Sequence, residues 1–554
     1  MSKTRRDFLR SCAALGITGA TASTLERFGA ITAHAQAASD YKALVCIFLF
    51  GGNDSNNMIV PVDSRYASYA AMRGPLALAG GTLLPAGASG LGLHPALANI
   101  QRLYGQRGAA IALNVGTLVQ PTTKATLRSV ALPRSLGSHV DQSQQWQTSD
   151  PTGGTTGWGG RVNDLLSALN TGTLTPGISV NSGNALFLSG EHTNPINFST
   201  GSQAGLKSSG SATAMATRVD SLQRLLTFDT GAKLVTAADG LLSDSLRSAQ
   251  MINAALAGAP ALPVTFPTSS IGKQLAQIAQ LISVRGALGM NRQIFFAGLG
   301  GFDTHENLLA TQQGLLTSLD QGVNAFFQAI DAFGLANQVT TFTESEFNRT
   351  GNANATLGTD HAWGGHHLII GGAVRGAATY GTFPTLEVGG PDDSGFDRGS
   401  WIPTTSLDQY ASTLAGWFGV TDTYLEAIFP NLSYFPVKSL DFLPNTPAQP
   451  LTFSDDPLGV QSSTVRSAHI NELRTAISLL RFRYRLPPFS WTDAPIVPGV
   501  TTIKRVHLTE MRVALGAVYA AAARTPPVYS DAAVSGPITA RNIAELRAAV
   551  RALW

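Results

Sequence analysis

Five short apolar runs, each followed by small or polar residues, most constrain what this chain can fold into. They are rich in Val, Ile, Leu and Phe with little polar alternation, which is typical of strands buried on both faces. Helical patterns lie between several of them, so the sequence predicts an α/β fold with a mostly parallel sheet covered by helices on both faces. The expected strands are residues 43–50, 109–115, 293–299, 339–342 and 367–370, and the expected helices between and after them are 95–104, 273–288, 308–335 and 407–418.

The first 35 residues have the pattern of an export signal. The paired arginines of "TRRDFLR" are followed by a modestly apolar stretch that ends in "AHA" before Gln36. We therefore expect residues 1–35 to be a twin-arginine (Tat) signal peptide, and the mature protein to be periplasmic or extracellular. No later run approaches the roughly 20 apolar residues of a membrane-spanning helix, so no transmembrane segment is expected after cleavage.

The composition changes twice along the rest of the chain. Residues 171–263 are rich in Ser, Thr, Gly and Ala and interrupt the α/β pattern. We interpret them as an insertion into a core domain of residues 36–445, placed where it could cap a site. Residues 446–462 have the Pro and Ser content of a linker. Beyond them, residues 463–554 are predicted to form a small all-α domain.

That C-terminal segment repeats one helical pattern three times. The repeats begin at Ala468, Val506 and Arg541, and each spaces its apolar residues as one stripe of a helix, so the three helices should share a core. Residues 463–554 hold twelve Lys or Arg against five Asp or Glu, whereas residues 36–462 hold 21 against 28. This asymmetry suggests an anionic envelope component as partner, or else a solvated scaffold with Arg–Glu pairs; no nucleic-acid partner is expected.

Acids and histidines gather where the predicted strands end. In a parallel sheet these positions share one edge, where carboxylates would repel each other unless a cation neutralised them. Asp54 follows the first strand, and "GTDHAWGGHH" leads into the last. The sequence therefore predicts a metal site with the candidate ligands Asp54, Asp303, His305, Glu346, Asp360, His361 and His366.

This ligand set also suggests the kind of ion and the reaction. Carboxylates and imidazoles without thiolate favour zinc or manganese over calcium or magnesium. Seven ligands are too many for one tetrahedral ion, so two divalent ions are expected, an arrangement suited to phosphoryl or sulfuryl transfer. The nucleophile is either Ser138 or a metal-bound water. Asn57 and His139 are candidates for substrate binding, and Arg349 could bind a substrate anion or pair with a neighbouring glutamate.

Together these motifs resemble a family of Tat-exported bacterial proteins of unknown function within the alkaline phosphatase and sulfatase superfamily. The resemblance runs from about Leu44 to Pro436 through "GGNDSNN", "SHVDQ", "GWGGR", "FDTH", "SEFNRT" and "GTDHAWGGHH". It implies a two-metal centre at the carboxyl edge of the sheet. The positions that match the superfamily's ligands are Asp54, Asp303, His305, Asp360, His361 and His366, with Glu346 placed to take one ligand position.

Two functions are consistent with these patterns. The first is an exported, metal-dependent hydrolase of phosphate or sulfate esters; the absence of a Cys/Ser-x-Pro-x-Arg motif lowers the expectation of a sulfatase. The alternative is a non-catalytic envelope protein that keeps a structural metal site and is attached through its basic repeats. A fold-level resemblance does not specify a substrate.

Overall fold

The structure is a computed structural model. It describes residues 41–181, 185–197, 200, 212–226, 233–444, 453–459, 464–484, 486–487, 489–494, 496–534 and 536–553. The predicted signal peptide, residues 1–35, lies outside the described residues, as do parts of the predicted insertion and linker. Within the described ranges, no helix combines the length and the apolar character needed to cross a membrane.

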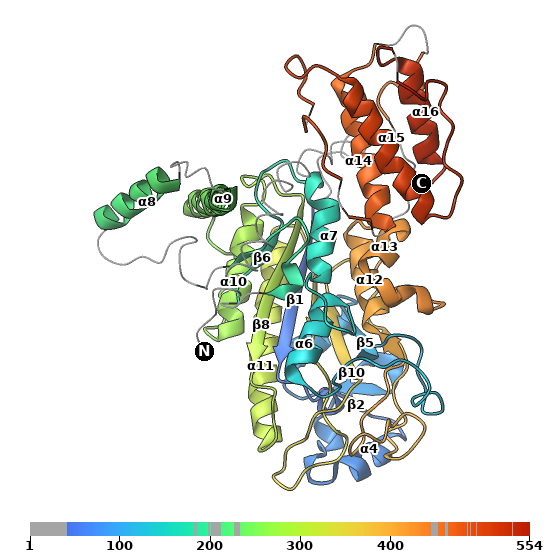
Figure 1. Ribbon diagram of the computed structural model, residues 1–554. Coiled ribbons are helices and arrows are strands. Elements are labelled where there is room, and N and C mark those ends of the chain that lie inside the picture. The colour runs from blue at the N-terminus through green and yellow to red at the C-terminus, as the bar shows by residue number, and fades with distance from the viewer. Residues whose placement is uncertain are drawn as a thin grey trace.

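A nine-stranded sheet forms the core (Figure 1). Its order is β11-β5-β10-β9-β1-β8-β6-β7, with β12 paired to β5. All five strands expected from the apolar runs are present. The strand bounds are β1 Lys42–Phe50, β5 Ala109–Gly116, β6 Gly177–Ser179, β7 Ile196–Asn197, β8 Arg292–Gly300, β9 Val339–Glu344, β10 Gly365–Ile370, β11 Thr379–Tyr380 and β12 Thr405–Ser406.

One strand of this sheet, β10, runs against its neighbours. It is antiparallel to both β9 and β5, whereas the other pairings are parallel. The residues just before β10 therefore lie at the same edge as the residues that follow β1, β8 and β9. We call this edge the rim, and it comprises residues 51–55, 301–305, 345–350 and 359–366.

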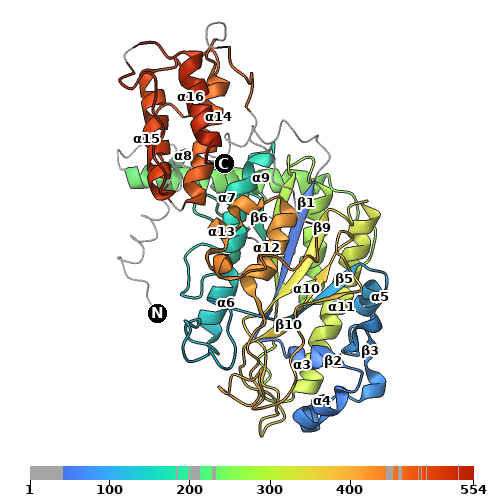
Figure 2. The same cartoon turned by 90° about the vertical axis from the view of Figure 1, so that its right-hand side faces the viewer.

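Helices cover both faces of the sheet, which confirms the predicted fold class (Figure 2). Along β1, Val45 and Ile47 point to one face, and Leu44 and Phe48 to the other, as the two-residue period of a strand requires. The first face packs on α5, α10 and α11, and the second on α6, α7, α12 and α13. The helix bounds are α5 Ala98–Gly105, α6 His139–Thr148, α7 Trp158–Leu166, α10 Ser270–Ser283, α11 Leu308–Ala332, α12 Leu407–Phe418 and α13 Asp422–Ile428.

A smaller layer lies beside the rim. The strands β2 (Ile59–Pro61), β4 (Leu91–Leu93) and β3 (Leu84–Pro85) form a three-stranded sheet. The short helix α3 (Ser55–Met58) and the helix α4 (Tyr66–Arg73) lie next to it. This layer brings α4 within reach of the loop that follows β1.

The insertion contributes two helices that lie away from the rim. They are α8 (Ala212–Leu226) and α9 (Lys233–Ala257), and both views show them near the end of the large sheet that lies far from α4. Ile252 of α9 packs into the core on the α10 side of the sheet. The described part of the insertion therefore does not cap the rim, contrary to the interpretation from the sequence.

The C-terminal helices form a closed ring with a core of their own. They are α14 (Ser467–Arg483), α15 (Arg505–Ala521) and α16 (Ala540–Arg551). Each helix carries an arginine that reaches a glutamate of the next helix, and the third returns to the first. The nearest N···O distances are 3.1 Å for Arg474–Glu510, 4.0 Å for Arg512–Glu545 and 3.1 Å for Arg547–Glu472.

Each joint of this ring also holds an aromatic residue from the loop before a helix. The guanidinium of Arg474 lies over Trp491, that of Arg512 over Tyr529, and that of Arg547 over Phe453. Phe453 belongs to the segment predicted as a linker, so the ring begins earlier than residue 463. Three of the twelve basic residues of this segment are thereby used inside the ring, as the scaffold interpretation supposed.

Candidate metal centre

The loops of the rim touch each other closely. Gly51 has a φ of 113°, and a Cβ at this position would lie 2.3 Å from the backbone nitrogen of Asp303. Gly51 also donates its N–H to Glu346 Oε1 at 2.8 Å. Only glycine permits this conformation together with such an approach, so the first glycine of "GGND" joins the loops after β1, β8 and β9.

The segments on either side of the β9–β10 connection form a short antiparallel ribbon, residues 346–350 with 359–363. Arg349 and His361 pair as a bridge, and the backbone bonds Asn348 N–H to Trp363 O at 3.0 Å and Thr350 N–H to Asp360 O at 2.9 Å. This ribbon fixes the Asp-His pair beside the arginine of "SEFNRT".

Three histidines of the site have their Nδ1 atoms held by acceptors. The pairs are His139 with Glu346 at 2.9 Å, His305 with Asp360 at 2.8 Å, and His361 with the carbonyl of Gly137 at 2.6 Å. Carboxylates and carbonyls can only accept here, so each Nδ1 carries the proton and each neutral ring has its lone pair on Nε2. Fixing a ring in this way is how proteins orient histidines that bind metals.

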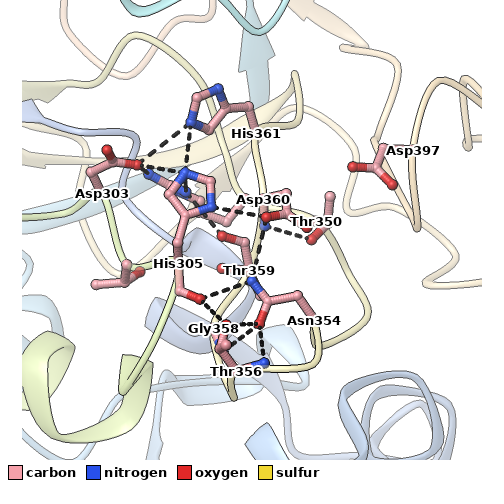
Figure 3. A network of polar contacts seen from close by, with 12 residues as sticks. Asp303, His305, Thr350, Asn354, Thr356, Gly358, Thr359, Asp360, His361 and Asp397 are labelled. Atoms are coloured by element: carbon pink, nitrogen blue, oxygen red, sulfur yellow. Dashed lines mark hydrogen bonds and ion pairs between the residues drawn. The ribbon is translucent and has the colours of Figure 1, made fainter.

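The three Nε2 atoms converge on Oδ1 of Asp303, and Figure 3 shows two of these histidines, His305 and His361, beside that carboxylate. The distance to this oxygen is 3.0 Å from His305 and 3.5 Å from both His139 and His361. The Nε2 atoms of His305 and His361 are themselves only 3.0 Å apart. Two lone pairs at that distance, beside a carboxylate, repel each other unless a proton or a cation lies among them.

A subset of these groups fits a divalent ion. The ligand atoms of His139, Asp303 and His361 all lie within 4.8 Å of one another, the one group of this kind in the described part of the chain. Nε2 of His139 is buried and has no hydrogen-bond partner. Two imidazoles and one carboxylate are a ligand set found in catalytic zinc sites, which keep a further position open.

Charged neighbours shift the pKa values of this group. The hydrogen bond that His139 donates to Glu346 raises the pKa of His139, whereas burial lowers the pKa of His361. Burial also acts to raise the pKa of Asp303, but the hydrogen bond and charge of Arg349 outweigh it and lower this pKa to about 2. Asp303 is therefore ionised at neutral pH, as a metal ligand must be.

Arg349 connects the loops of the rim through its side chain and has no N–H donor left for a substrate. Its side chain is fully buried, and its five N–H groups contact Gly51 O, Gly52 O, Thr359 O, His305 Nε2 and Asp303 Oδ1. The predicted bidentate grip on a substrate anion is thus replaced by contacts within the protein.

Asp54, expected as a ligand, pairs with an arginine instead. Oδ2 of Asp54 accepts from Arg73 Nη2 at 2.7 Å and from the Thr359 hydroxyl at 3.1 Å, and both members of the ion pair are buried. Arg73 comes from α4 and supplies the positive charge that the prediction assigned to a metal ion. Asn57 is also occupied, because its Oδ1 accepts from Arg73 Nε at 3.0 Å and from Tyr69 at 2.8 Å.

Two other predicted ligands, Glu346 and His366, have different surroundings from those expected. Glu346 holds the Nδ1 side of His139. His366 accepts a hydrogen bond from the backbone N–H of Asn114 on its Nδ1 at 3.0 Å and stacks on Phe383. It is not part of the group around Asp303. The contacts thus support one ion, not the expected two.

Ser138 forms the N-cap of α6. Its hydroxyl accepts from the Asp141 N–H and donates to the Asp141 carboxylate at 2.8 Å. The adjacent residues Gly137 and His139 contact the histidine group, but the serine hydroxyl itself is engaged with its own helix.

His305 and Asp360 form a pair that the predicted ligand list did not anticipate. Asp360 accepts from His305 through Oδ1 and from Arg398 through Oδ2. Arg398 lies in the loop before β12, and no motif marked it. The result is a chain of contacts from Arg398 through the carboxylate of Asp360 to the ring of His305, and Nε2 of that ring faces Asp303.

A pocket of about 330 Å³ opens beside this pair. Its lining includes His305, Asp360 and His361 from the site, together with residues of two neighbouring loops. The additional lining residues are Leu136, Gly137, Ala362, Trp363, Phe396, Asp397 and Ser400. A ligand in this pocket would therefore lie against the histidine group.

Comparison with solved structures gives distant similarities. The chain is similar to Ps i-CgsB in complex with k-i-k-neocarrahexaose, at 12% identity over 71% of this chain and 72% of that chain, with a TM-score of 0.28. It is similar to the PsFucS1 sulfatase from Pseudoalteromonas sp. at 9% identity over 76% of each chain, with a TM-score of 0.28. It is similar to a mutant of the alkaline phosphatase PafA at 12% identity over 57% of this chain and 64% of that chain, with a TM-score of 0.22. TM-scores this low carry no argument about function.

The sequence itself was compared with curated proteins and with family models. The search of curated proteins found no match. One family model matches residues 41–393, which include every strand of the sheet except β12, the histidine group and the lining of the pocket up to Trp363. The chain therefore belongs to the family described as protein of unknown function (DUF1501).

Proposed function

We propose that this protein is an exported, metal-dependent hydrolase of phosphate or sulfate esters. One divalent ion, zinc or manganese, would be held by His139, Asp303 and His361. Such an ion, when bound, supplies positive charge for a developing oxyanion and makes water more acidic. The observation that carries the proposal is the convergence of His139, Asp303 and His361, whose ligand atoms all lie within 4.8 Å of one another, with Nε2 of His139 buried and without a hydrogen-bond partner.

In this proposal His305 moves the proton. Its Nδ1–H is held by Asp360, which fixes the tautomer and would stabilise the charged ring, as carboxylates do beside catalytic histidines. Nε2 of His305 would take a proton from the attacking water and return it to the leaving alcohol. Because His305 also lines the pocket, the alcohol can leave next to that nitrogen.

Water is a better candidate for the nucleophile than Ser138. The serine hydroxyl donates to Asp141, so its proton is directed away from any base in the histidine group. Helix capping also accounts for the presence of a serine at this position.

The test is metal analysis of the purified mature protein combined with a screen of phosphate and sulfate esters. His361→Ala should lose both metal and turnover. His305→Ala should retain the metal and lose about 10²- to 10⁴-fold in kcat, the usual contribution of general acid–base catalysis. Wild-type protein with only trace metal, or His305→Ala with an unchanged rate, would contradict the proposal.

The alternative, a non-catalytic envelope protein attached through its C-terminal segment, has less support. Its anionic partner would need free basic side chains, yet Arg474, Arg512 and Arg547 are engaged within the ring. It predicts bound metal without turnover of any ester in the same screen.

A further inference from the structure

The pocket beside His305 has an acidic lining. Apart from the histidines, its ionisable lining residues are Asp360 and Asp397, and no lysine or arginine of the described chain lines it. Arg398 contacts both carboxylates, with its Nε 3.2 Å from Asp397 Oδ1, and so holds them in place without being a lining residue. Asp397 comes from a different loop than the histidines (Figure 3).

The pocket also has an aromatic lining. Phe396 is a large apolar side chain that is 54% exposed. Its ring lies 6.4 Å from that of the buried Trp363, with 23° between the two planes. An exposed aromatic ring presents a negative face, which attracts a cation placed within about 6 Å of its centre.

From this lining we infer that the pocket binds a cationic group, an ammonium carried by the alcohol part of the substrate. The inference rests on the proposed function, in which the acid group of the ester lies against the histidines. The substrates would then be phosphate or sulfate esters of small amino alcohols. The volume suits a small group, because it is near the lower end of the range of about 300–1,000 Å³ for ligand pockets.

The same lining disfavours other alcohol groups. A second anion would meet Asp360 and Asp397 and be repelled. A neutral apolar group could lie on Phe396, but it would remove water from the carboxylate of Asp397, whose protein contacts are those from Arg398, and this costs free energy. A quaternary or protonated amine satisfies both the ring and the carboxylate.

The test compares two ligands that differ in charge but hardly in shape. Choline and its neutral isostere dimethylbutanol, in which carbon replaces the nitrogen, are titrated into the full-length protein by calorimetry. We expect choline to bind about tenfold more tightly, within the range of a cation–aromatic contact assisted by a carboxylate. Phe396→Leu keeps the apolar volume and Asp397→Asn keeps the shape, and each should weaken choline binding by about three- to tenfold.

The controls separate this inference from the proposed hydrolysis. Neither ligand is an ester, so binding needs no turnover. Dimethylbutanol should bind equally to wild type and Asp397→Asn. Equal affinity of the two ligands for the wild type, absent choline binding, or choline binding unchanged in both variants would overturn the inference. Choline binding in a protein that hydrolyses no ester would support the pocket and count only against the hydrolase proposal.

Discussion

The rim and the C-terminal ring use the same pairing of acids with buried arginines but differ in their histidines. In the ring, Nδ1 of His507 accepts the Lys504 N–H at 3.1 Å, and Nε2 contacts Asp493 at 3.1 Å. His469 makes the equivalent two contacts. In the histidine group of the candidate site, Nε2 of His139 has no hydrogen-bond partner, and Nε2 of His305 faces that of His361 at 3.0 Å with one long contact, 3.4 Å, from Arg349 Nη1.

This difference separates structural histidines from a candidate site. A ring histidine with two bonded nitrogens stabilises a helix start and its preceding loop, and nothing further is needed to satisfy it. At the candidate site, by contrast, the Nε2 lone pair of one histidine faces that of another. Two hydrogen-bond acceptors in this position repel each other, which costs free energy until a cation is added. Both regions are rich in His, Asp and Arg, so composition alone would not distinguish them.

The largest expected effect compares one histidine from each region. His361→Ala at the rim should lower metal content at least about tenfold and abolish ester hydrolysis, because a ligand is lost. His507→Ala in the ring should leave metal content and rate unchanged and reduce only stability. Elemental analysis and rate measurements on the same preparations check this, and equal metal loss in both variants would remove the distinction.

The next prediction concerns arginines. Arg349→Met and Arg547→Met should each destabilise the protein by about 3–5 kcal/mol, because each leaves buried polar groups without their partner. Zinc should restore part of the stability of Arg349→Met, since the ion can neutralise Asp303, and none of that of Arg547→Met. Urea unfolding with and without zinc measures both; recovery of the ring variant would contradict the comparison.

Glu344 extends the comparison between the two regions to a buried acid that has no arginine partner. Its side-chain contacts are with Cys46 and Trp158. Burial raises its pKa to about 8. The folded state therefore holds a proton that the unfolded state releases, so the stabilisation is complete below about pH 4.5 and is lost as the pH rises towards about 8.

Glu344→Gln should remove that part of the pH dependence. Relative to wild type, it should gain up to about 4 kcal/mol between about pH 5 and about pH 8, at roughly 1.4 kcal/mol per pH unit. Urea unfolding across this range checks the slope. Parallel curves for the two proteins would show that Glu344 is not the group that titrates.

The smallest expected effect is that of Ser138→Ala. Loss of the N-cap of α6 should cost about 1 kcal/mol, with ester hydrolysis close to the wild-type rate. Thermal unfolding and kcat are the measurements. Abolished turnover in a stable variant would instead restore Ser138 as the nucleophile.

The sequence allowed the sheet and its functional edge to be predicted. Apolar runs such as residues 43–50 signal strands directly, and parallel topology then brings the ends of β1, β8 and β9 together, so Asp54, Asp303 and His305 could be grouped without a structure. The sequence did not predict that β10 is antiparallel, and it is this direction that places His361 at the same edge. No sequence pattern pointed to Arg73 or Arg398, which lie outside the motifs. Arg73 pairs with Asp54 and so takes the place of the expected metal ion. Arg398 holds Asp360, whose other carboxylate oxygen contacts His305.

The start of the ring was missed for a different reason. Phe453-Ser454-Asp455 has the same pattern as Trp491-Thr492-Asp493 and Tyr529-Ser530-Asp531, but the Pro- and Ser-rich residues around it obscured the match. A comparison of the three aromatic-Ser/Thr-Asp triplets would have found it.

The ribbon that leads into β10 has a mechanical consequence. Arg349 and His361 face each other across two hydrogen-bonded backbone segments. When the sheet bends, the two residues should therefore move together. The spacing of His361 and Asp360 from Arg349 would thus survive fluctuations that displace the outer helices. The arrangement of charged side chains on this ribbon can therefore stay constant while the rest of the molecule fluctuates.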